Sequence, residues 1–185
     1  MKKHIVTACL YTLITAIGLG LLYPLAITTI AHLAFREKAD GQLIQRNGQV
    51  VGSRLLGQSF SGPGYFRSRP SAAGNGYDAV ASSGSNLAST NKALIARVDA
   101  SVSAEPQGNN VPVDLVTASG SGLDPDITPA AAFYQVPRIA RERHLSEDRL
   151  RALVEQHITP RQFGLLGEPR VNTLQLNLDL DSLSR

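Results

Sequence analysis

The chain has 185 residues, enough for one membrane anchor and one small domain but too few for two large domains. The part from Arg36 onward contains 16 of the 18 basic residues and all 15 acidic residues. Its net charge is therefore only +1. Aromatic residues make up 5% and no Lys/Arg cluster exists, which argues against nucleic-acid binding. The single cysteine, Cys9, excludes intrachain disulfides and Cys-based zinc sites.

The N-terminal segment is apolar enough to cross a membrane. Residues 5–35 contain no Asp, Glu, Lys or Arg, and a helix needs about 20 apolar residues to span a hydrocarbon core. A cleaved signal peptide is the alternative, but its apolar region is about 7–15 residues long and ends at small residues. We therefore predict an N-terminal segment with one uncleaved transmembrane helix at residues 1–35, followed by a soluble domain at residues 36–185.

Flanking charges predict the orientation of this helix. Lys2 and Lys3, with the free amine, favour a cytoplasmic N-terminus, whereas Arg36 and Lys38 argue mildly for the opposite. Because large domains translocate largely regardless of their charge, the N-terminal lysines count for more. We expect the soluble domain to lie outside the cytoplasm.

One face of the apolar segment carries small residues. Ala8, Thr12, Ala16 and Gly20 recur every four residues, which lets another helix approach closely, although small residues are common enough in such helices for chance to produce the pattern. Pro24 follows at the same step and lacks a backbone N–H, so a kink is expected near Tyr23-Pro24.

The soluble part mixes strands and helices. Asn47-Gly48 between two short β-prone runs predicts a hairpin within residues 39–60. Residues 61–86 are rich in Gly, Ser, Pro and Asn, which is typical of a disordered linker, but their spaced aromatics favour an ordered, packed loop. A helix is expected to start near Ser89 or Thr90.

The remaining elements complete a mixed α+β domain. Gln107–Asn110 is expected to form a turn and Val111–Val116 a short strand. Thr128-Pro129 marks the start of a helix that reaches His144 and contains Pro137. Ser146 caps a further helix, and the alternation of Leu with polar residues over Val171–Leu180 predicts a half-buried strand.

The common catalytic motifs are absent. The chain has neither the phosphate-binding G-x-x-x-x-G-K-[ST] nor the G-x-S-x-G nucleophile elbow. Ser89-Thr90-Asn91-Lys92 matches the S-x-x-K of penicillin-binding enzymes, but neither S-D-N nor K-T-G accompanies it. The four histidines include no pair at a spacing of three or four, so no metal site is expected. We predict no catalytic residues, and a membrane-anchored envelope enzyme using a Ser/Gly-rich loop remains the alternative function.

Two Ser/Gly segments echo each other. Ser83-Gly84-Ser85 resembles Ser119-Gly120-Ser121-Gly122, which continues into Leu123-Asp124-Pro125. Such loops bind anions through exposed backbone N–H groups, or they serve as tight turns whose serines satisfy the loop backbone. The sequence leaves both interpretations open.

Taken in order, several segments resemble the C subunits of the Kdp potassium-transporting ATPases. The similarity extends from the anchor to the end of the chain. It rests on Tyr23-Pro24-Leu25, Gly57-Gln58, Tyr65-Phe66, Arg69-Pro70-Ser71-Ala72, Tyr77-Asp78, Ala81–Leu87, Val116–Pro125 and Leu166–Asn172.

This resemblance implies a non-catalytic accessory subunit of an ATP-driven, high-affinity potassium uptake complex in the bacterial inner membrane. Its partners would be a channel-like potassium subunit, an ATP-hydrolysing P-type subunit and a small membrane subunit. The family is described as raising the ATP affinity of the pump subunit, which makes ATP the implied ligand. The candidate cradle is Ser119, Gly120, Ser121 and Gly122 with Gln135, but Asp124 and Asp126 would repel a triphosphate. We expect a dissociation constant no tighter than about 1 mM.

Overall fold

The computed structural model describes residues 1–105 and 110–183. It divides into two compact units, Met1–Ser53 and Arg54–Arg185, which we describe separately. Most of the turn predicted at Gln107–Asn110 lies outside the described residues.

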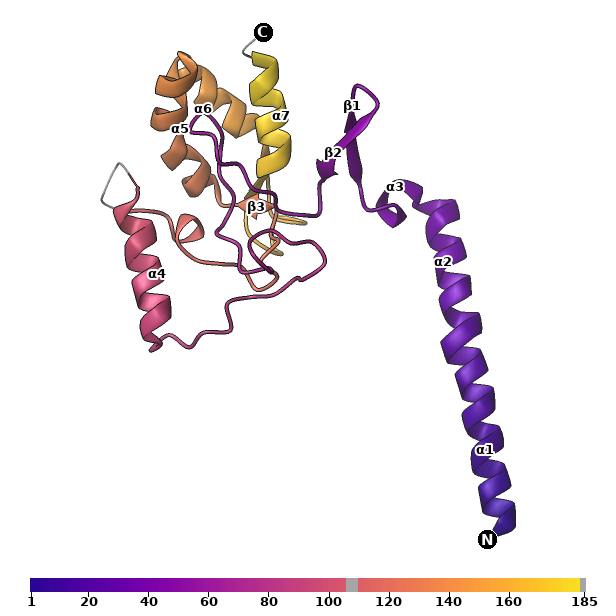
Figure 1. The fold of residues 1–185 in the computed structure, drawn as a ribbon. Helices are drawn as coiled ribbons and strands as arrows, with labels where there is room; N and C mark the ends of the chain where they lie inside the picture. Colours follow the sequence, from indigo (N-terminus) through magenta and orange to yellow (C-terminus); the bar gives the residue numbers. More distant parts are fainter. Residues whose placement is uncertain (106–109, 184–185) are drawn as a thin grey trace. The chain divides into compact units, whose positions relative to one another are not determined.

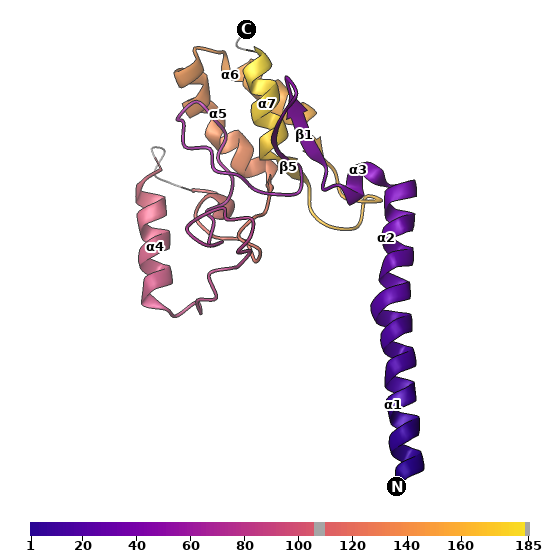
Figure 2. The ribbon, with the colours of Figure 1, turned by 45° about the vertical axis from the view of Figure 1, so that its right-hand side comes forward.

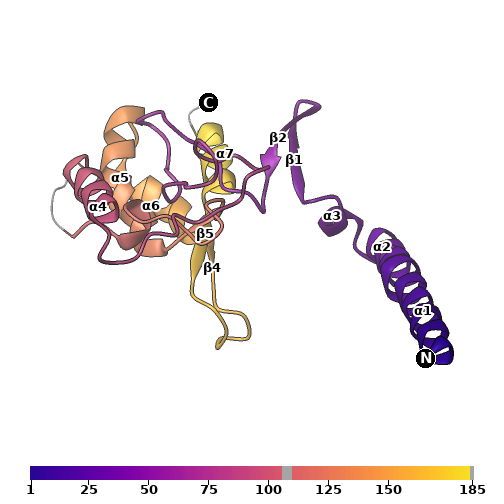
Figure 3. The same ribbon diagram turned by 60° about the horizontal axis from the view of Figure 1, so that its bottom comes forward.

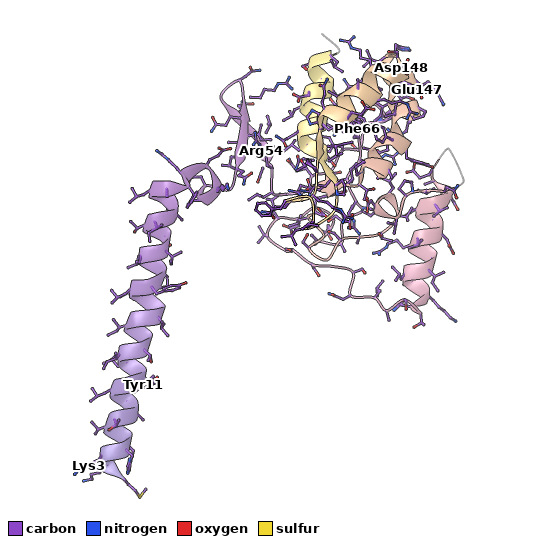
Figure 4. The ribbon with its side chains drawn as sticks, turned by 180° about the vertical axis from the view of Figure 1, so that it is seen from behind. Lys3, Tyr11, Arg54, Phe66, Glu147 and Asp148 are labelled. Carbon is purple, nitrogen blue, oxygen red and sulfur yellow. The ribbon has the colours of Figure 1, made fainter. Side chains whose placement is uncertain are left out.

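The first unit is dominated by one long apolar helix (Figure 1). It runs from Lys2 to Ala34 without a break, as α1 (Lys2–Ile17), a π-helical turn η1 (Gly18–Leu22) and α2 (Tyr23–Ala34). At 1.5 Å per residue it is about 50 Å long, more than a bilayer core requires. None of its residues is buried, and side chains such as Tyr11 project freely (Figure 4). The predicted membrane-spanning helix is thus present by length and composition.

The π-helical turn explains how this helix accommodates Pro24. A proline has no N–H to donate, and its ring clashes with the carbonyl four residues earlier, here that of Gly20. In the structure the Tyr23 N–H bonds to the Gly18 carbonyl, five residues back. This wider turn makes room for the ring without ending the helix. The structure thus places a π-helical turn about one turn before the proline. The kink expected near Tyr23-Pro24 stays a prediction.

A short helix and a hairpin complete the first unit. Helix α3 (Arg36–Ala39) leads into strands β1 (Leu43–Arg46) and β2 (Gln49–Ser53), which pair antiparallel. Asn47 and Gly48 link them with φ values of 53° and 77°, the left-handed conformation that a two-residue hairpin turn requires. The predicted hairpin is confirmed.

The second unit packs three helices and a small sheet around one core (Figures 1 and 2). Strands β3 (Asp126–Ile127), β5 (Arg170–Asn172) and β4 (Ile158–Thr159) form an antiparallel sheet in that order. Helices α5, α6 and α7 supply most of the buried apolar side chains. Its elements are α4 (Lys92–Ser103), the 3₁₀ turn η2 (Val113–Leu115), β3 (Asp126–Ile127), α5 (Pro129–Arg143), α6 (Glu147–Gln156), β4 (Ile158–Thr159), β5 (Arg170–Asn172) and α7 (Thr173–Leu183).

Side-chain caps fix the starts of three helices. Thr128 accepts the Ala131 N–H at 3.2 Å and Ser146 accepts the Arg149 N–H at 3.4 Å, as the sequence predicts for α5 and α6. Pro137 lies inside α5 without ending it. Helix α4 begins later than predicted, because Asn91 rather than Ser89 or Thr90 provides the cap.

Two strand predictions are wrong. The expected strand Val171–Leu180 is only β5 at its start, and the rest is helix α7, which buries Leu174, Leu176, Asn177 and Leu180. These positions follow the i, i+3, i+4 helical spacing, and leucine favours helix whereas β-branched residues are absent from Leu174 onward. The expected strand Val111–Val116 is the turn η2, where buried Asp114 accepts the Thr128 N–H at 2.8 Å.

The long Gly/Ser/Pro loop is ordered because side-chain amides hold its backbone. Phe66 is fully buried at the centre of the second unit (Figure 4). Its N–H donates to Oδ1 of Asn177 at 2.9 Å, and its carbonyl accepts from Nδ2 of the same residue at 2.8 Å. The next residue, Arg67, makes the same pair of bonds with Gln135, at 2.8 and 3.2 Å. We call these four bonds the amide clamp.

Two arginines of α5 extend the amide clamp along the loop. Arg138 donates to the carbonyls of Pro63 and Tyr65, the latter at 3.0 Å. Arg143 donates to the Gly64 carbonyl at 2.9 Å and lies over the Tyr65 ring. Burial and neighbouring Arg67 lower the pKa of Arg138 to about 10, which still leaves it charged at neutral pH.

Breaking the amide clamp should destabilise the second unit. Asn177→Leu would leave the buried N–H and carbonyl of Phe66 without partners, so we expect a loss of about 3 kcal/mol in the free energy of unfolding. Denaturant unfolding of the detergent-solubilised chain, followed by circular dichroism, measures this. Gln175→Ala, a partly exposed position on the same helix, is the control and should change stability by less than about 0.5 kcal/mol. Equal effects of the two variants would contradict the role of the amide clamp.

Candidate functional site

The two Ser/Gly segments that echo each other in sequence lie against each other in the structure. The Ser83 N–H donates to the Ser121 carbonyl at 2.9 Å. A Cβ on Gly84 would lie 3.0 Å from the Gly120 carbonyl oxygen. The Ser119–Gly122 loop is therefore one half of a packed pair of turns.

Gly122 is the tightest point of this pair. It has a φ of 66°, and a Cβ there would lie 2.4 Å from the Ser83 carbonyl oxygen and 2.7 Å from the Ala73 nitrogen. Its carbonyl accepts a hydrogen bond from Ser71 Oγ at 2.6 Å. Only glycine fits both the conformation and the space.

Polar groups of the loop already serve the loop itself. The Gly122 N–H bonds to the Ser119 carbonyl at 3.3 Å, and the Leu123 N–H bonds to Ser121 Oγ at 3.1 Å. Ser119 is buried, and its hydroxyl lies 3.4 Å from that of Ser121. These contacts favour the interpretation as tight turns over an anion cradle, which would need outward-facing N–H groups.

Sequence reasoning missed the cation that lies beside this loop. Arg69 donates to the Ala118 carbonyl at 3.3 Å and pairs with Asp124 at 3.5 Å. It comes from a position about 50 residues earlier, so no local pattern could place it there. The Arg69 guanidinium thus interacts with a carboxylate and a carbonyl of the protein itself, rather than facing an empty anion site.

Gln135, the fifth residue predicted to bind a nucleotide, is 3% exposed and belongs to the amide clamp. Its Oε1 accepts from the Arg67 N–H and from Arg138, while its Nε2 donates to the carbonyls of Arg67 and Ala131. This uses the full hydrogen-bonding capacity of the amide. Gln135 lines a cavity of about 290 Å³ whose walls do not include the Ser119–Gly122 loop. Nucleotide binding by these five residues stays a prediction.

The cavity next to the loop is rich in carboxylates. It measures about 250 Å³, and its lining includes Asp114, Asp124, Asp126, Glu168 and two arginines. Burial raises the pKa of the Asp126 carboxyl above its ordinary value, and this outweighs the lowering by Asn172 and by Arg170, which pairs with it at 3.0 Å. With more carboxylates than arginines in its lining, this cavity is expected to disfavour a triphosphate. Within residues 1–105 and 110–183, no group of three or more His, Cys, Asp or Glu could hold a metal ion.

The S-x-x-K match has no enzyme-like surroundings. Ser89 and Lys92 are both exposed, in the turn before α4 and at its first residue. An activated serine requires a base held within hydrogen-bond reach and a shielded site. Among the residues that the structure describes, no base bonds to Ser89, and Ser89 itself is exposed.

The packed turns predict a sharp contrast between two neighbouring glycines. Gly122→Ala should cost at least about 2 kcal/mol of stability, because alanine is strained at positive φ and its Cβ would meet backbone atoms. Gly120→Ala should be nearly neutral, because nothing lies within 4 Å of a Cβ there. Denaturant midpoints of the two full-length variants decide the matter. If Gly120→Ala is the more destabilising of the two, this loop geometry is wrong.

Comparison with known proteins supplies the family. A sequence model described as "KdpC: K+-transporting ATPase, c chain" matches residues 5–182. The potassium-transporting ATPase KdpC subunit of Acidobacterium capsulatum is 63% identical over 182 residues, covering 98% of this chain and 99% of that one. Those of Koribacter versatilis and Gemmatimonas aurantiaca are 57% and 53% identical, covering 98% and 100% of this chain and 95% of each relative. The chain therefore belongs to the KdpC family, the c chain of the potassium-transporting ATPase.

Proposed function

We propose that this protein is a non-catalytic accessory subunit that assembles and stabilises an ATP-driven potassium uptake complex. Family membership over nearly the whole chain carries the proposal. One spanning helix cannot enclose a pore, so ion conduction falls to a channel-like potassium subunit. ATP hydrolysis falls to a P-type subunit, and a small membrane subunit completes the complex. The alternative of an envelope enzyme finds no supporting geometry at Ser89.

The membrane helix supplies the first surface for assembly. All of its large apolar side chains are exposed, which suits a helix that lies among lipids and other helices. A shallow apolar groove follows the small residues and is lined by Ala8, Cys9, Thr12, Leu13 and Ala16. A partner helix approaching along this row would gain close van der Waals contact, the main driving force for association in lipid.

Two glycines of the π-helical turn provide a matched test of this face. Gly20 continues the row of small residues, whereas Gly18 lies roughly 200° around the helix from it. A Cβ at either position meets no atom within 4 Å, so the chain itself tolerates both substitutions. Gly20→Ile should lower the amount of this chain that purifies with the ATP-hydrolysing subunit by about tenfold, and Gly18→Ile should not. Normal incorporation of Gly20→Ile would mean that the row of small residues is not a packing face.

We further propose that the N-terminus is cytoplasmic and the second unit extracytoplasmic. Lys2 and Lys3 support this orientation, and the near-neutral charge after residue 35 does not oppose translocation. ATP is cytoplasmic, so any effect on the ATP affinity of the pump subunit would then be transmitted through the complex. The packed Ser119–Gly122 loop and the carboxylates beside it agree with direct binding no tighter than about 1 mM.

Paired reporters test the orientation and show whether this domain lies on the side of the membrane where ATP is present. One reporter that is active only outside the cytoplasm and one that is active only inside are fused separately after Arg185. We expect activity from the first alone. Activity of the cytoplasmic reporter alone would overturn the orientation and would make direct contact between this domain and ATP possible.

A further inference from the structure

Two asparagine–glycine pairs occur in the chain, and the structure places them in different surroundings. Asn47-Gly48 forms the turn that joins β1 to β2 (Figure 3), whereas Asn75-Gly76 lies in the long Gly/Ser/Pro loop of the second unit. All four residues are exposed to solvent. An Asn-Gly pair is chemically labile, because glycine has no Cβ to shield its backbone nitrogen from the neighbouring side chain. The hydrogen bonds around each pair therefore decide how fast it reacts.

The reaction at such a pair is a deamidation in which water is the only co-reactant. The backbone nitrogen of the glycine attacks Cγ of the asparagine, and a cyclic succinimide forms. The Cγ–Nδ2 bond breaks, and Nδ2 leaves as ammonia together with the proton of the glycine N–H. Water then opens the ring at Cγ to give aspartate, or at the main-chain carbonyl to give isoaspartate, in which the main chain continues through Cβ and Cγ.

The turn at Asn47-Gly48 leaves the reacting groups unrestrained. Among the residues that the structure describes, neither the Gly48 N–H nor the Asn47 side chain has a hydrogen-bond partner. Ring closure brings the Gly48 nitrogen to the side of the Asn47 Cβ, which requires the left-handed turn to open transiently. Opening costs little here, because the hairpin has only two strands and its residues are exposed or half-buried except for Ser53.

The other pair, Asn75-Gly76, is held by the packed part of its loop. The Gly76 N–H donates to the Ala73 carbonyl at 2.8 Å, and Ala73 is fully buried. The next residue, Tyr77, is fixed as well, since its N–H donates to Ser71 Oγ at 2.7 Å. The Gly76 nitrogen can therefore reach the Asn75 side chain only after these bonds break. Equal exposure of the two pairs thus hides unequal freedom to react.

We propose that Asn47 is a site of spontaneous deamidation and isoaspartate formation, and that isoaspartate there opens the β1–β2 hairpin. The two-residue turn closes with a left-handed φ at both positions, 53° at Asn47 and 77° at Gly48. Isoaspartate adds a methylene to the main chain between them, so the strands lose their register. Aspartate tolerates the left-handed conformation and keeps the turn. The inference does not depend on the function proposed above.

Timed incubation of the purified full-length chain in detergent tests the site. The buffer is mildly alkaline and enriched in oxygen-18 water, which labels each new carboxylate, and peptides from both pairs are measured by mass spectrometry. We expect Asn47 to react at least about tenfold faster than Asn75, because more than one hydrogen bond has to break before Asn75 can react. In denaturant the two rates should become similar, since both pairs then lose their surroundings. A folded chain in which Asn75 reacts as fast as Asn47 overturns the assignment.

Hydrogen exchange tests the effect on the hairpin. Asn47→Asp is the matched control, because it carries the new charge on an unaltered main chain. In wild-type chains whose Asn47 has fully reacted, we expect a population whose β1–β2 amides exchange at least about tenfold faster than in fresh wild-type chains. The Asn47→Asp chain should exchange like the fresh wild type. Equal exchange in the reacted wild type and in Asn47→Asp would overturn the opening of the hairpin.

Discussion

The fold of the soluble part depends on two side-chain amides, which make the backbone hydrogen bonds that a neighbouring β-strand would otherwise provide. Phe66 is buried and Arg67 half-buried, and within the described residues neither belongs to a strand. Asn177 from α7 and Gln135 from α5 instead supply the four hydrogen bonds of the amide clamp. Without these bonds the N–H and carbonyl groups of Phe66 would be buried without partners, which costs free energy.

The amide clamp explains why a loop so rich in Gly, Ser and Pro is ordered. Once Phe66 is fixed in the core, Arg69 two residues beyond Arg67 reaches the Ala118 carbonyl and Asp124. Farther along, the turns at Ser83 and Gly122 pack against each other. The Ser/Gly segments therefore act as structural joints between distant parts of the chain, and Gln135 is committed to the same purpose.

The use of these polar side chains within the fold limits which of them are free to bind a ligand. Gln135, Asn177, Ser119 and Arg69 all hold the fold together through hydrogen bonds or ion pairs within the domain. The membrane helix exposes a row of small residues, lined as a shallow apolar groove by Ala8, Thr12 and Ala16 among others. These features are compatible with the assembly role proposed above for a chain of the KdpC family.

The sequence by itself determined the elements whose causes are local. Apolar length predicted the membrane helix, Asn47-Gly48 predicted the hairpin, and Thr128 and Ser146 predicted the starts of α5 and α6. Each depends on one contiguous stretch of the sequence, so a linear pattern is enough. The fold class followed from the same local signals.

Tertiary structure decided the rest, because the causes lie far apart in the chain. Val171–Leu180 alternates like a strand, yet it forms α7 after β5, since Leu174, Leu176 and Leu180 meet the core on one helical face and Asn177 must reach Phe66. The surroundings of the Ser119–Gly122 loop depend on Ser83 and Arg69, which are about 40 and 50 residues away. Asn177 likewise binds a residue 111 positions earlier, and no local pattern in the sequence can specify a pairing over that separation.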